Sequence, residues 1–364
     1  YDHFMQKEIF EQPQAIRDVL ESRVTNNSVI TSSFGYKADV IFKNTKQIQI
    51  VACGTSYHAG LVAKYWIEDI AKIPCNVEIA SEYRYRRPIL LGQTLFVTLS
   101  QSGETADTVE ALKAAKKINS EVKSLCICNS PESSLTRLSD LAFLTHAGPE
   151  IGVASTKAFT TQLVSLALLL CSIGKIQNNI NLKQEKEIVD GLKKLPGLIN
   201  EALFQETQIK NLAKCFKDKN SALFLGRGTM YAIAMEGALK LKEISYIHAE
   251  AYPAGELKHG PIALIDKNMP VIAIAPNDDL LEKLKSNLQE VKSRGSQMIV
   301  FEDENSKIKS MEAMKVIPIT SNLGRITAPI IFTIPLQLLS YHVAIIKGTD
   351  VDKPRNLAKS VTVE

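Results

Sequence analysis

The sequence predicts an α/β protein made of two tandem domains, each with a doubly wound parallel sheet. Apolar, strand-like runs alternate with segments of helical spacing, a pattern typical of parallel sheets. The pattern also repeats, because Thr55 and Thr229 are 174 residues apart and Ser100 and Ala275 are 175 apart. The chain of 364 residues is also too long for one ordinary core.

The first repeat accounts for the elements up to residue 175. Residues 3–24 have helical spacing, which Pro13 is expected to interrupt. A strand at 48–53 is expected to end in a turn at 54–56, followed by a helix over 57–71. The next elements are strands at 77–80, 95–99, 124–128 and 141–145, a basic connection at 83–91, a helix at 106–118 and an apolar helix that ends at Gly174.

The second repeat follows a polar helical linker. The elements that we expect are strands at 222–226, 270–275, 297–301 and 316–318, and helices at 230–247, 279–293 and 329–346. The predicted divisions are a lead-in helix (1–24), a first domain (25–175), a linker (176–205), a second domain (206–347) and a tail (348–364) that could fold over a site.

The segment that ends the strand at 95–99 is the first candidate site. Ser100-Gln-Ser-Gly-Glu-Thr105 joins a strand to the amino end of a helix, where free backbone N–H groups and the helix dipole favour an anion. Hydroxyls and an amide add neutral donors, from Ser100, Gln101, Ser102 and Thr105. An ordinary N-capped turn is the alternative. The second repeat has Pro276-Asn-Asp-Asp279 here, and its carboxylates would repel a phosphate. We therefore predict a phosphate cradle in the first repeat only.

The overall composition is that of an ordinary soluble protein. Apolar residues make up 45% of the chain and charged residues 23%, with a net charge of +4. The one basic cluster, Arg84-Tyr-Arg-Arg87, is too short to indicate nucleic-acid binding. We expect neither a nucleic-acid partner nor a membrane.

The cysteines and the apolar stretches indicate a cytosolic protein. The six cysteines mostly lie in apolar runs, as reduced core cysteines do, and no spacing suggests zinc or another metal. The stretches 163–171 and 326–346 are interpreted as too short and too interrupted to span a membrane. No signal peptide is visible, and the start without Met suggests a fragment of a longer protein.

Two further segments carry residues suited to proton transfer. In the helix at 230–247, Glu236, Lys240 and Glu243 share one face, so Glu243 could act as a base; a surface ion-pair ladder is the alternative. A Gly/Pro-bounded loop over 248–261 brings Glu256, Lys258 and His259 together, although such a histidine is often structural. With the cradle, these residues suggest sugar-phosphate isomerisation.

Six segments resemble the glutamine:fructose-6-phosphate amidotransferases (glucosamine-6-phosphate synthases). They begin at Ala52 (ACGTS), Leu99 (LSQSGETAD), Glu150 (EIGVASTKAFT), Leu239 (LKLKEISY), Gly255 (GELKHG) and Pro354 (PRNLAKSVTVE). The resemblance covers the whole chain as the isomerase half, with two sugar-isomerase (SIS) domains of flavodoxin-like αβα type. His58 and the Lys/Asn-rich linker favour a eukaryotic or fungal source.

The resemblance implies a role for each matching residue. The substrate-binding residues would be Cys53, Gly54, Thr55, Ser56, Ser100, Gln101, Ser102, Thr105, Val153, Ser155 and Ala358, of which Thr55, Ser100, Gln101, Ser102 and Thr105 hold the phosphate. His259, from the other subunit, would open the sugar ring. Glu243, assisted by Lys240, would move a proton from C1 to C2, and Lys359 would contact the open-chain carbonyl and form an imine with it.

The resemblance also implies partners and excludes a cofactor. The partners would be fructose 6-phosphate, glucosamine 6-phosphate and glucose 6-phosphate, a glutaminase domain of the same longer chain, and a second copy in a homodimer or tetramer. UDP-N-acetylglucosamine is a possible inhibitor. None of the six cysteines lies at the amino terminus, where the family's glutaminase has its nucleophile, so this chain should not use glutamine.

Two rival functions are weighed against this one. A sugar-phosphate sensor would lack Glu243 or His259 and would usually carry a helix-turn-helix. An aminosugar-phosphate deaminase or a deglycase would not need the tail or the Glu-Leu-Lys-His loop.

Overall fold

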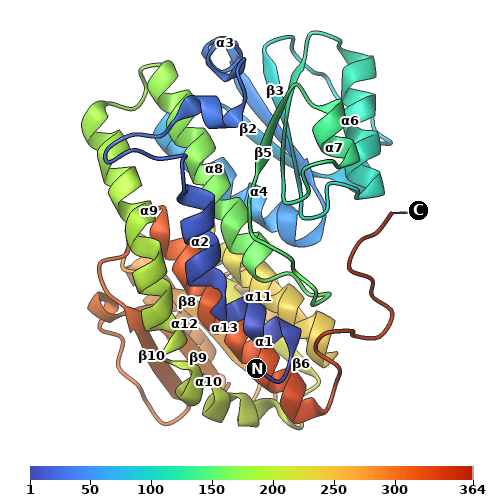
Figure 1. Cartoon of the computed structure of the whole chain (residues 1–364). Coiled ribbons are helices and arrows are strands. Elements are labelled where there is room, and N and C mark those ends of the chain that lie inside the picture. Colours follow the sequence, from blue (N-terminus) through green and yellow to red (C-terminus); the bar gives the residue numbers. More distant parts are fainter. Residues whose placement is uncertain (363–364) are drawn as a thin grey trace. The chain divides into compact units, whose positions relative to one another are not determined.

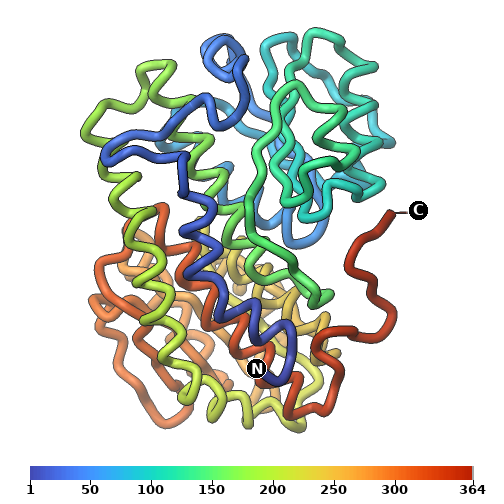
Figure 2. The backbone as a smooth tube through the Cα atoms, viewed as in Figure 1, coloured from blue at the N-terminus to red at the C-terminus, as the bar shows by residue number. Residues whose placement is uncertain are grey.

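The computed structural model describes residues 1–362. The chain folds into two compact units (Figure 1), and its backbone path can be followed in Figure 2. The first-sheet unit holds residues 14–150 and 157–194 and the tail from Ala358. The second-sheet unit holds residues 1–13, 151–156 and 195–357. Each unit contains one five-stranded parallel sheet, which confirms the predicted fold class. The domain divisions at 24, 175 and 205 stay predictions.

The first sheet has the order β2-β1-β3-β4-β5. Its strands are β1 (Gln47–Ala52), β2 (Cys75–Ile79), β3 (Thr94–Ser100), β4 (Lys123–Cys128) and β5 (Leu141–Leu144). The chain first adds β2 on one side of β1 and then returns to add β3 on the other. Such a reversal leaves a crevice at the carboxyl ends of β1 and β3, where ligands bind in folds of this kind.

Helices cover both faces of this sheet. They are η1 (Thr31–Phe34), α3 (Ala38–Asn44), α4 (Gly54–Trp66), the π-helical turn η2 (Ile67–Ala71), α5 (Ala80–Tyr83), α6 (Ala106–Ile118), α7 (Ser134–Leu138) and α8 (Lys157–Ile176). α3 and α4 pack with α8, and α5 and α7 pack with α6. The core under α6 joins Val51, Phe96 and Leu112, so burial of apolar side chains fixes the cradle-bearing turn at the sheet edge.

The second sheet repeats the topology in the order β10-β9-β8-β6-β7. Its strands are β6 (Ser221–Gly226), β7 (His248–Pro253), β8 (Val271–Ala275), β9 (Met298–Asp303) and β10 (Met314–Thr320). Its helices are α10 (Glu206–Ala213), η3 (Lys214–Phe216), α11 (Thr229–Ser245), η4 (Ala254–His259), η5 (Pro261–Leu264), α12 (Leu281–Lys292), η6 (Glu304–Ser306) and α13 (Thr327–Lys347). Since β6 and β8 correspond to β1 and β3, the duplication predicted from residue spacing is confirmed.

The amino-terminal helices and the linker agree with the sequence in outline. α1 (Phe4–Phe10) and α2 (Gln12–Leu20) are separated at Glu11. Pro13 lies in the first turn of α2, where the missing N–H leaves no hydrogen bond unmade. α9 (Leu182–Leu203) fills the predicted linker and contains Pro196.

Two local predictions are wrong. The expected turn at 54–56 is the first turn of α4, because Gly54, with φ +52°, allows the helix to begin directly after Cys53. The expected loop at 248–253 is the edge strand β7, paired with β6 from Ser221 to Gly226. Its alanines and glutamate have low strand propensity, so pairing with β6 decides its conformation.

The two most apolar helices are longer than expected. α8 has 20 residues and α13 has 21, and by length and composition either could cross a membrane. The arguments that 163–171 is too short and that 326–346 is too interrupted were therefore both wrong. In both helices 89% of the most apolar window is buried inside the protein, as in core helices of globular domains.

Candidate active site

The cradle lies at the reversal point of the first sheet. Ser100 ends β3, and its Oγ accepts a hydrogen bond from the Gly103 N–H (2.9 Å) and lies 3.0 Å from Thr105 Oγ1. The Ser102 Oγ accepts from the Glu104 N–H at 3.1 Å. Gln101, Ser102 and Thr105 are partly exposed. The predicted donors therefore converge in one folded turn that remains open to solvent.

Gly103 and Glu104 fix the shape of this turn. Gly103 has φ +69°, and a Cβ there would lie 2.1 Å from Ser133 Oγ. The Glu104 carboxylate accepts hydrogen bonds from the N–H and the hydroxyl of Ser134, both at 2.7 Å. These bonds lower the pKa of Glu104 and favour its ionised form. The carboxylate faces the amino end of α7, where a negative charge is stabilised.

The amino end of α4 lies beside the cradle's strand, because β1 and β3 are neighbours. Cys53 and Gly54 lead into α4, and Thr55 and Ser56 occupy its first turn. The Ser56 Oγ accepts from Gln162 Nε2 at 3.0 Å. Burial raises the pKa of the Cys53 thiol. Cys53 therefore lines the turn as a neutral thiol.

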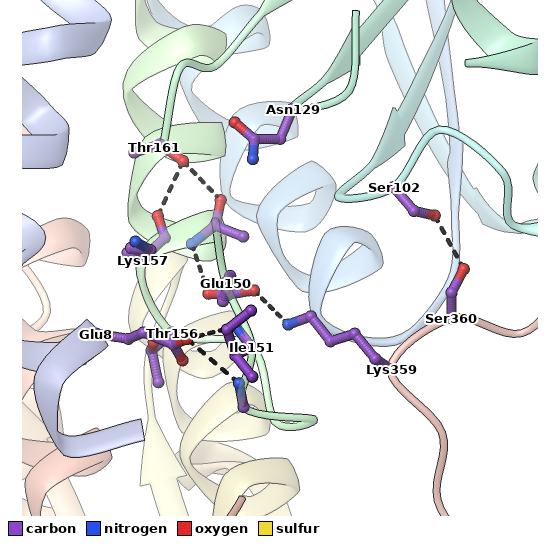
Figure 3. Close-up of polar contacts among 12 residues, drawn as sticks. Glu8, Ser102, Asn129, Glu150, Ile151, Thr156, Lys157, Thr161, Lys359 and Ser360 are labelled. Carbon is purple, nitrogen blue, oxygen red and sulfur yellow. Dashed lines mark hydrogen bonds and ion pairs between the residues drawn. The ribbon is translucent and has the colours of Figure 1, made fainter. Parts of the chain in front are cut away.

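The end of the tail contacts this same turn (Figure 3). Lys359 Nζ lies 2.6 Å from Glu150 Oε2, and the hydroxyls of Ser360 and Ser102 lie 3.1 Å apart. The Ala106 N–H, at the start of α6, donates to the Val361 carbonyl at 3.1 Å. Ala358 is exposed. These contacts hold the end of the tail against the turn, whereas the role of the tail as a cover over an active site stays a prediction.

A separate network in the second-sheet unit holds the loop with Val153 and Ser155. The Val153 N–H donates to the Asp352 carbonyl at 3.0 Å. The buried Glu8 carboxylate of α1 accepts from the N–H groups of Ile151 and Gly152. The loop conformation therefore depends on groups far away in the sequence.

The proposed base and its neighbours lie on α11 of the second-sheet unit. Lys240 Nζ lies 2.6 Å from Glu243 Oε2 and 3.4 Å from Glu236 Oε1. The Lys240 side chain is 1% exposed and that of Glu243 is 21% exposed. The alternative of a surface ion-pair ladder is therefore wrong, because Lys240 is buried between two carboxylates and is not exposed to solvent.

His259 is the last residue of η4 and is exposed. Lys258 forms an ion pair with Glu290 of α12 at 3.0 Å, which anchors this segment to its own unit. The geometry leaves the imidazole accessible from solvent.

At the equivalent place in the second sheet, acidic residues replace the neutral donors of the cradle. Asp278 and Asp279 follow β8, and burial together with Asp279 raises the pKa of Asp278. Asp278 and Arg227 lie there among apolar side chains such as Ile274 and Leu281. The predicted asymmetry between the two repeats is thus present at matching positions of the two sheets.

Other features of the described residues lie outside this chemistry. No group of three or more His, Cys, Asp or Glu among residues 1–362 could hold a metal ion. All six cysteines are free thiols, and burial raises the pKa of Cys75 and Cys171 to about 12. A cavity of about 650 Å³ between α12 and residues 307–314 contains none of the predicted site residues.

Sequence reasoning missed three polar residues, namely Glu150 and Ser360 in the first-sheet unit and Glu8 in the second-sheet unit. Ser360 follows Lys359 directly, so its place beside Ser102 followed from the tail prediction. Neither glutamate has a comparable local signal, because their partners lie 143 and 209 residues away.

Comparisons with known proteins agree with this fold. The SIS domain family matches residues 41–172 and 215–347. The chain therefore belongs to the SIS domain family.

Within that family, one solved structure is similar to this chain over nearly the whole length of both. The chain shares 55% identity and a TM-score of 0.95 with the C-terminal domain of glucosamine-fructose-6-phosphate aminotransferase from Francisella tularensis, covering 97% of this chain and 99% of that one. A glucosamine-6-phosphate deaminase from Thermotoga maritima, at 24% identity and TM-score 0.77, covers 99% of each chain and shares the fold alone.

Curated relatives are longer than this chain. It is 58% identical over its full length to the glutamine--fructose-6-phosphate aminotransferase [isomerizing] of Pseudomonas putida, and 57% identical to that of Haemophilus influenzae. In both cases it spans 59% of the relative. These relatives are bacterial, so the expectation of a eukaryotic source is not borne out.

Proposed function

We propose that this chain is the sugar-isomerase half of a glutamine-fructose-6-phosphate aminotransferase. It converts fructose 6-phosphate and ammonia into glucosamine 6-phosphate, the first step towards UDP-N-acetylglucosamine. The observation that carries the proposal is the asymmetry of the duplicated fold. Donors and a helix amino end fill the reversal point of the first sheet, whereas Asp278 and Asp279 occupy it in the second. One phosphate per chain is the expected stoichiometry.

The phosphate-binding set follows from the donors at this point. Thr55, Ser100, Gln101, Ser102 and Thr105 bind the phosphate through hydroxyl, amide and backbone N–H groups, without a lysine. Cys53, Gly54, Ser56, Val153, Ser155 and Ala358 line the sugar. Neutral donors at a helix terminus bind a dianion while they leave the lysines free for the sugar carbon chain.

Proton transfer is assigned to the carboxylate of α11. Ammonia condenses at C2 of the open-chain ketose and leaves an imine, and Glu243 then moves a proton from C1 to C2. The Lys240 ammonium, 2.6 Å from Glu243, stabilises the carboxylate after it gives up the proton. His259 of a second subunit opens the ring, and Lys359 contacts the C2 carbonyl.

Several partners belong to the same proposal. A glutaminase domain of the longer protein supplies the ammonia, and the chain works as a homodimer or tetramer in the cytoplasm. UDP-N-acetylglucosamine is the candidate inhibitor.

The test follows fructose 6-phosphate by NMR in D₂O, with and without ammonium. An aldose product with deuterium at C2 is expected, and Glu243→Gln should abolish it. Binding without turnover in either condition would contradict the proposal and favour a sugar-phosphate sensor. Release of ammonia from glucosamine 6-phosphate as the main reaction would indicate a deaminase.

A further inference from the structure

We propose that Glu150 positions the tail lysine Lys359 and exchanges a proton with it. This inference rests on the proposed function, because it concerns how Lys359 reacts with the sugar carbonyl. The Glu150 side chain is 0% exposed and lies 2.6 Å from the Lys359 ammonium, to which it is joined across 209 residues of sequence.

The carboxylate of Glu150 is held from both sides (Figure 3). Its Oε1 accepts a hydrogen bond at 3.0 Å from the N–H of Ala158, the second residue of α8. A negative charge is stabilised at this end of a helix. Its Oε2 is thereby directed at Lys359, so the carboxylate forms a fixed anchor and not one half of a mobile surface pair.

Besides this ion pair, the end of the tail has two neutral contacts near the cradle, namely the Ser360–Ser102 hydroxyl pair and the hydrogen bond from the Ala106 N–H to the Val361 carbonyl. Residues 355–358 are exposed, whereas Lys359 and Ser360 are partly buried. The ion pair with Glu150 is charge-assisted and short, and therefore stronger than the hydroxyl contact of Ser360 with Ser102. Glu150 therefore determines where the Lys359 amine lies relative to the Ser100–Thr105 turn.

The same contact provides the proton transfer that imine formation needs. The Lys359 ammonium gives a proton to the Glu150 carboxylate, and the neutral amine attacks C2 of the open-chain ketose. The new C–N bond gives a carbinolamine after the oxygen takes up a proton, and loss of water leaves a protonated imine. Glu150 mediates these transfers and ends as carboxylate, so the net change is ammonium plus carbonyl to protonated imine plus one water. Ammonia then adds to C2 of this imine and displaces the Lys359 amine, which leaves the ammonia-derived imine on which Glu243 acts.

The experiment compares Glu150→Gln and Glu150→Asp with wild type. Glu185→Gln is the matched control: Glu185 is another buried carboxylate of the first-sheet unit, 3.0 Å from Lys175 and bonded to the Val29 N–H. Each protein is incubated with fructose 6-phosphate and cyanoborohydride, and mass spectrometry locates and quantifies the reduced adduct. Isomerisation kinetics and tryptic cleavage after Arg355 and Lys359, without substrate, are measured in parallel.

We expect the adduct on Lys359 in wild type and in Glu185→Gln. In Glu150→Gln it should form about 10- to 100-fold more slowly, because the amine loses its fixed position. kcat should fall with KM nearly unchanged, tryptic cleavage should be faster, and Glu150→Asp should recover part of the rate. A structural role alone would affect Glu150→Gln and Glu185→Gln alike.

Three results would overturn the inference while leaving the proposed function intact. They are wild-type turnover with no adduct on Lys359, a Glu150→Gln variant that forms adduct as fast as wild type or faster, and a change confined to KM. Wild type without any turnover of fructose 6-phosphate would instead count against the proposed function.

Discussion

Gly103→Ala tests whether the cradle depends on one backbone conformation. Gly103 has φ +69°, and a Cβ would lie 2.1 Å from Ser133 Oγ and 2.4 Å from Ser133 Cβ. The left-handed conformation costs a non-glycine residue about 1–2 kcal/mol. Overpacking adds about 1–3 kcal/mol. We expect a total loss of about 2–5 kcal/mol from the stability of the first-sheet unit.

The matched control is Gly148→Ala, in the same unit. Gly148 has φ +70°, but the nearest atom to a new Cβ would be Lys157 Nζ at 3.7 Å. Gly148→Ala should therefore lose only the free energy of the left-handed backbone conformation, about 1–2 kcal/mol. The difference between the two variants isolates the clash with Ser133.

The assay is urea unfolding followed by circular dichroism, with calorimetric titration of fructose 6-phosphate. Gly103→Ala should also weaken fructose 6-phosphate binding, because the turn that carries Ser100 and Ser102 must shift away from Ser133. If Gly103→Ala destabilises the protein no more than Gly148→Ala and binds sugar phosphate equally well, the reasoning is refuted.

Two further predictions concern charged groups. Glu104→Gln should lower stability by about 1 kcal/mol at pH 7, since it removes a charged acceptor from Ser134. Because the folded pKa of Glu104 is lowered, its contribution is complete above its unfolded pKa and is lost as the pH falls through the folded value. The wild-type and variant melting temperatures should therefore converge in acid. Lys240→Met should destabilise by about 3–5 kcal/mol in thermal melting, because it leaves the buried Glu236 and the partly buried Glu243 without their shared cation.

A surface pair provides the control for Lys240. Lys186 and Asp190 form an i,i+4 ion pair whose side chains are 50% and 41% exposed. Lys186→Met should change stability by less than about 1 kcal/mol. Equal effects of the two lysine substitutions would contradict the buried-cluster interpretation.

Local sequence patterns determined the elements and the cradle. Apolar runs flanked by turn residues predicted nine of the ten strands found within residues 1–362, because the hydrophobic period is a property of neighbouring residues. The contrast between Ser100–Thr105 and Pro276–Asp279 is equally local, since both segments follow a strand. The spacing of Glu236, Lys240 and Glu243 on one face of a helix also predicted their mutual contact.

Long-range packing decided the remainder. Strand β7 exists because β6 offers a free edge, although the sequence His248–Pro253 has little strand propensity of its own. The burial of Lys240 depends on what packs over α11, which includes α13, about a hundred residues away. Glu150 pairs with Lys359, which lies 209 residues further along the chain. A buried charge must be compensated, but only the folded chain determines which distant group compensates it.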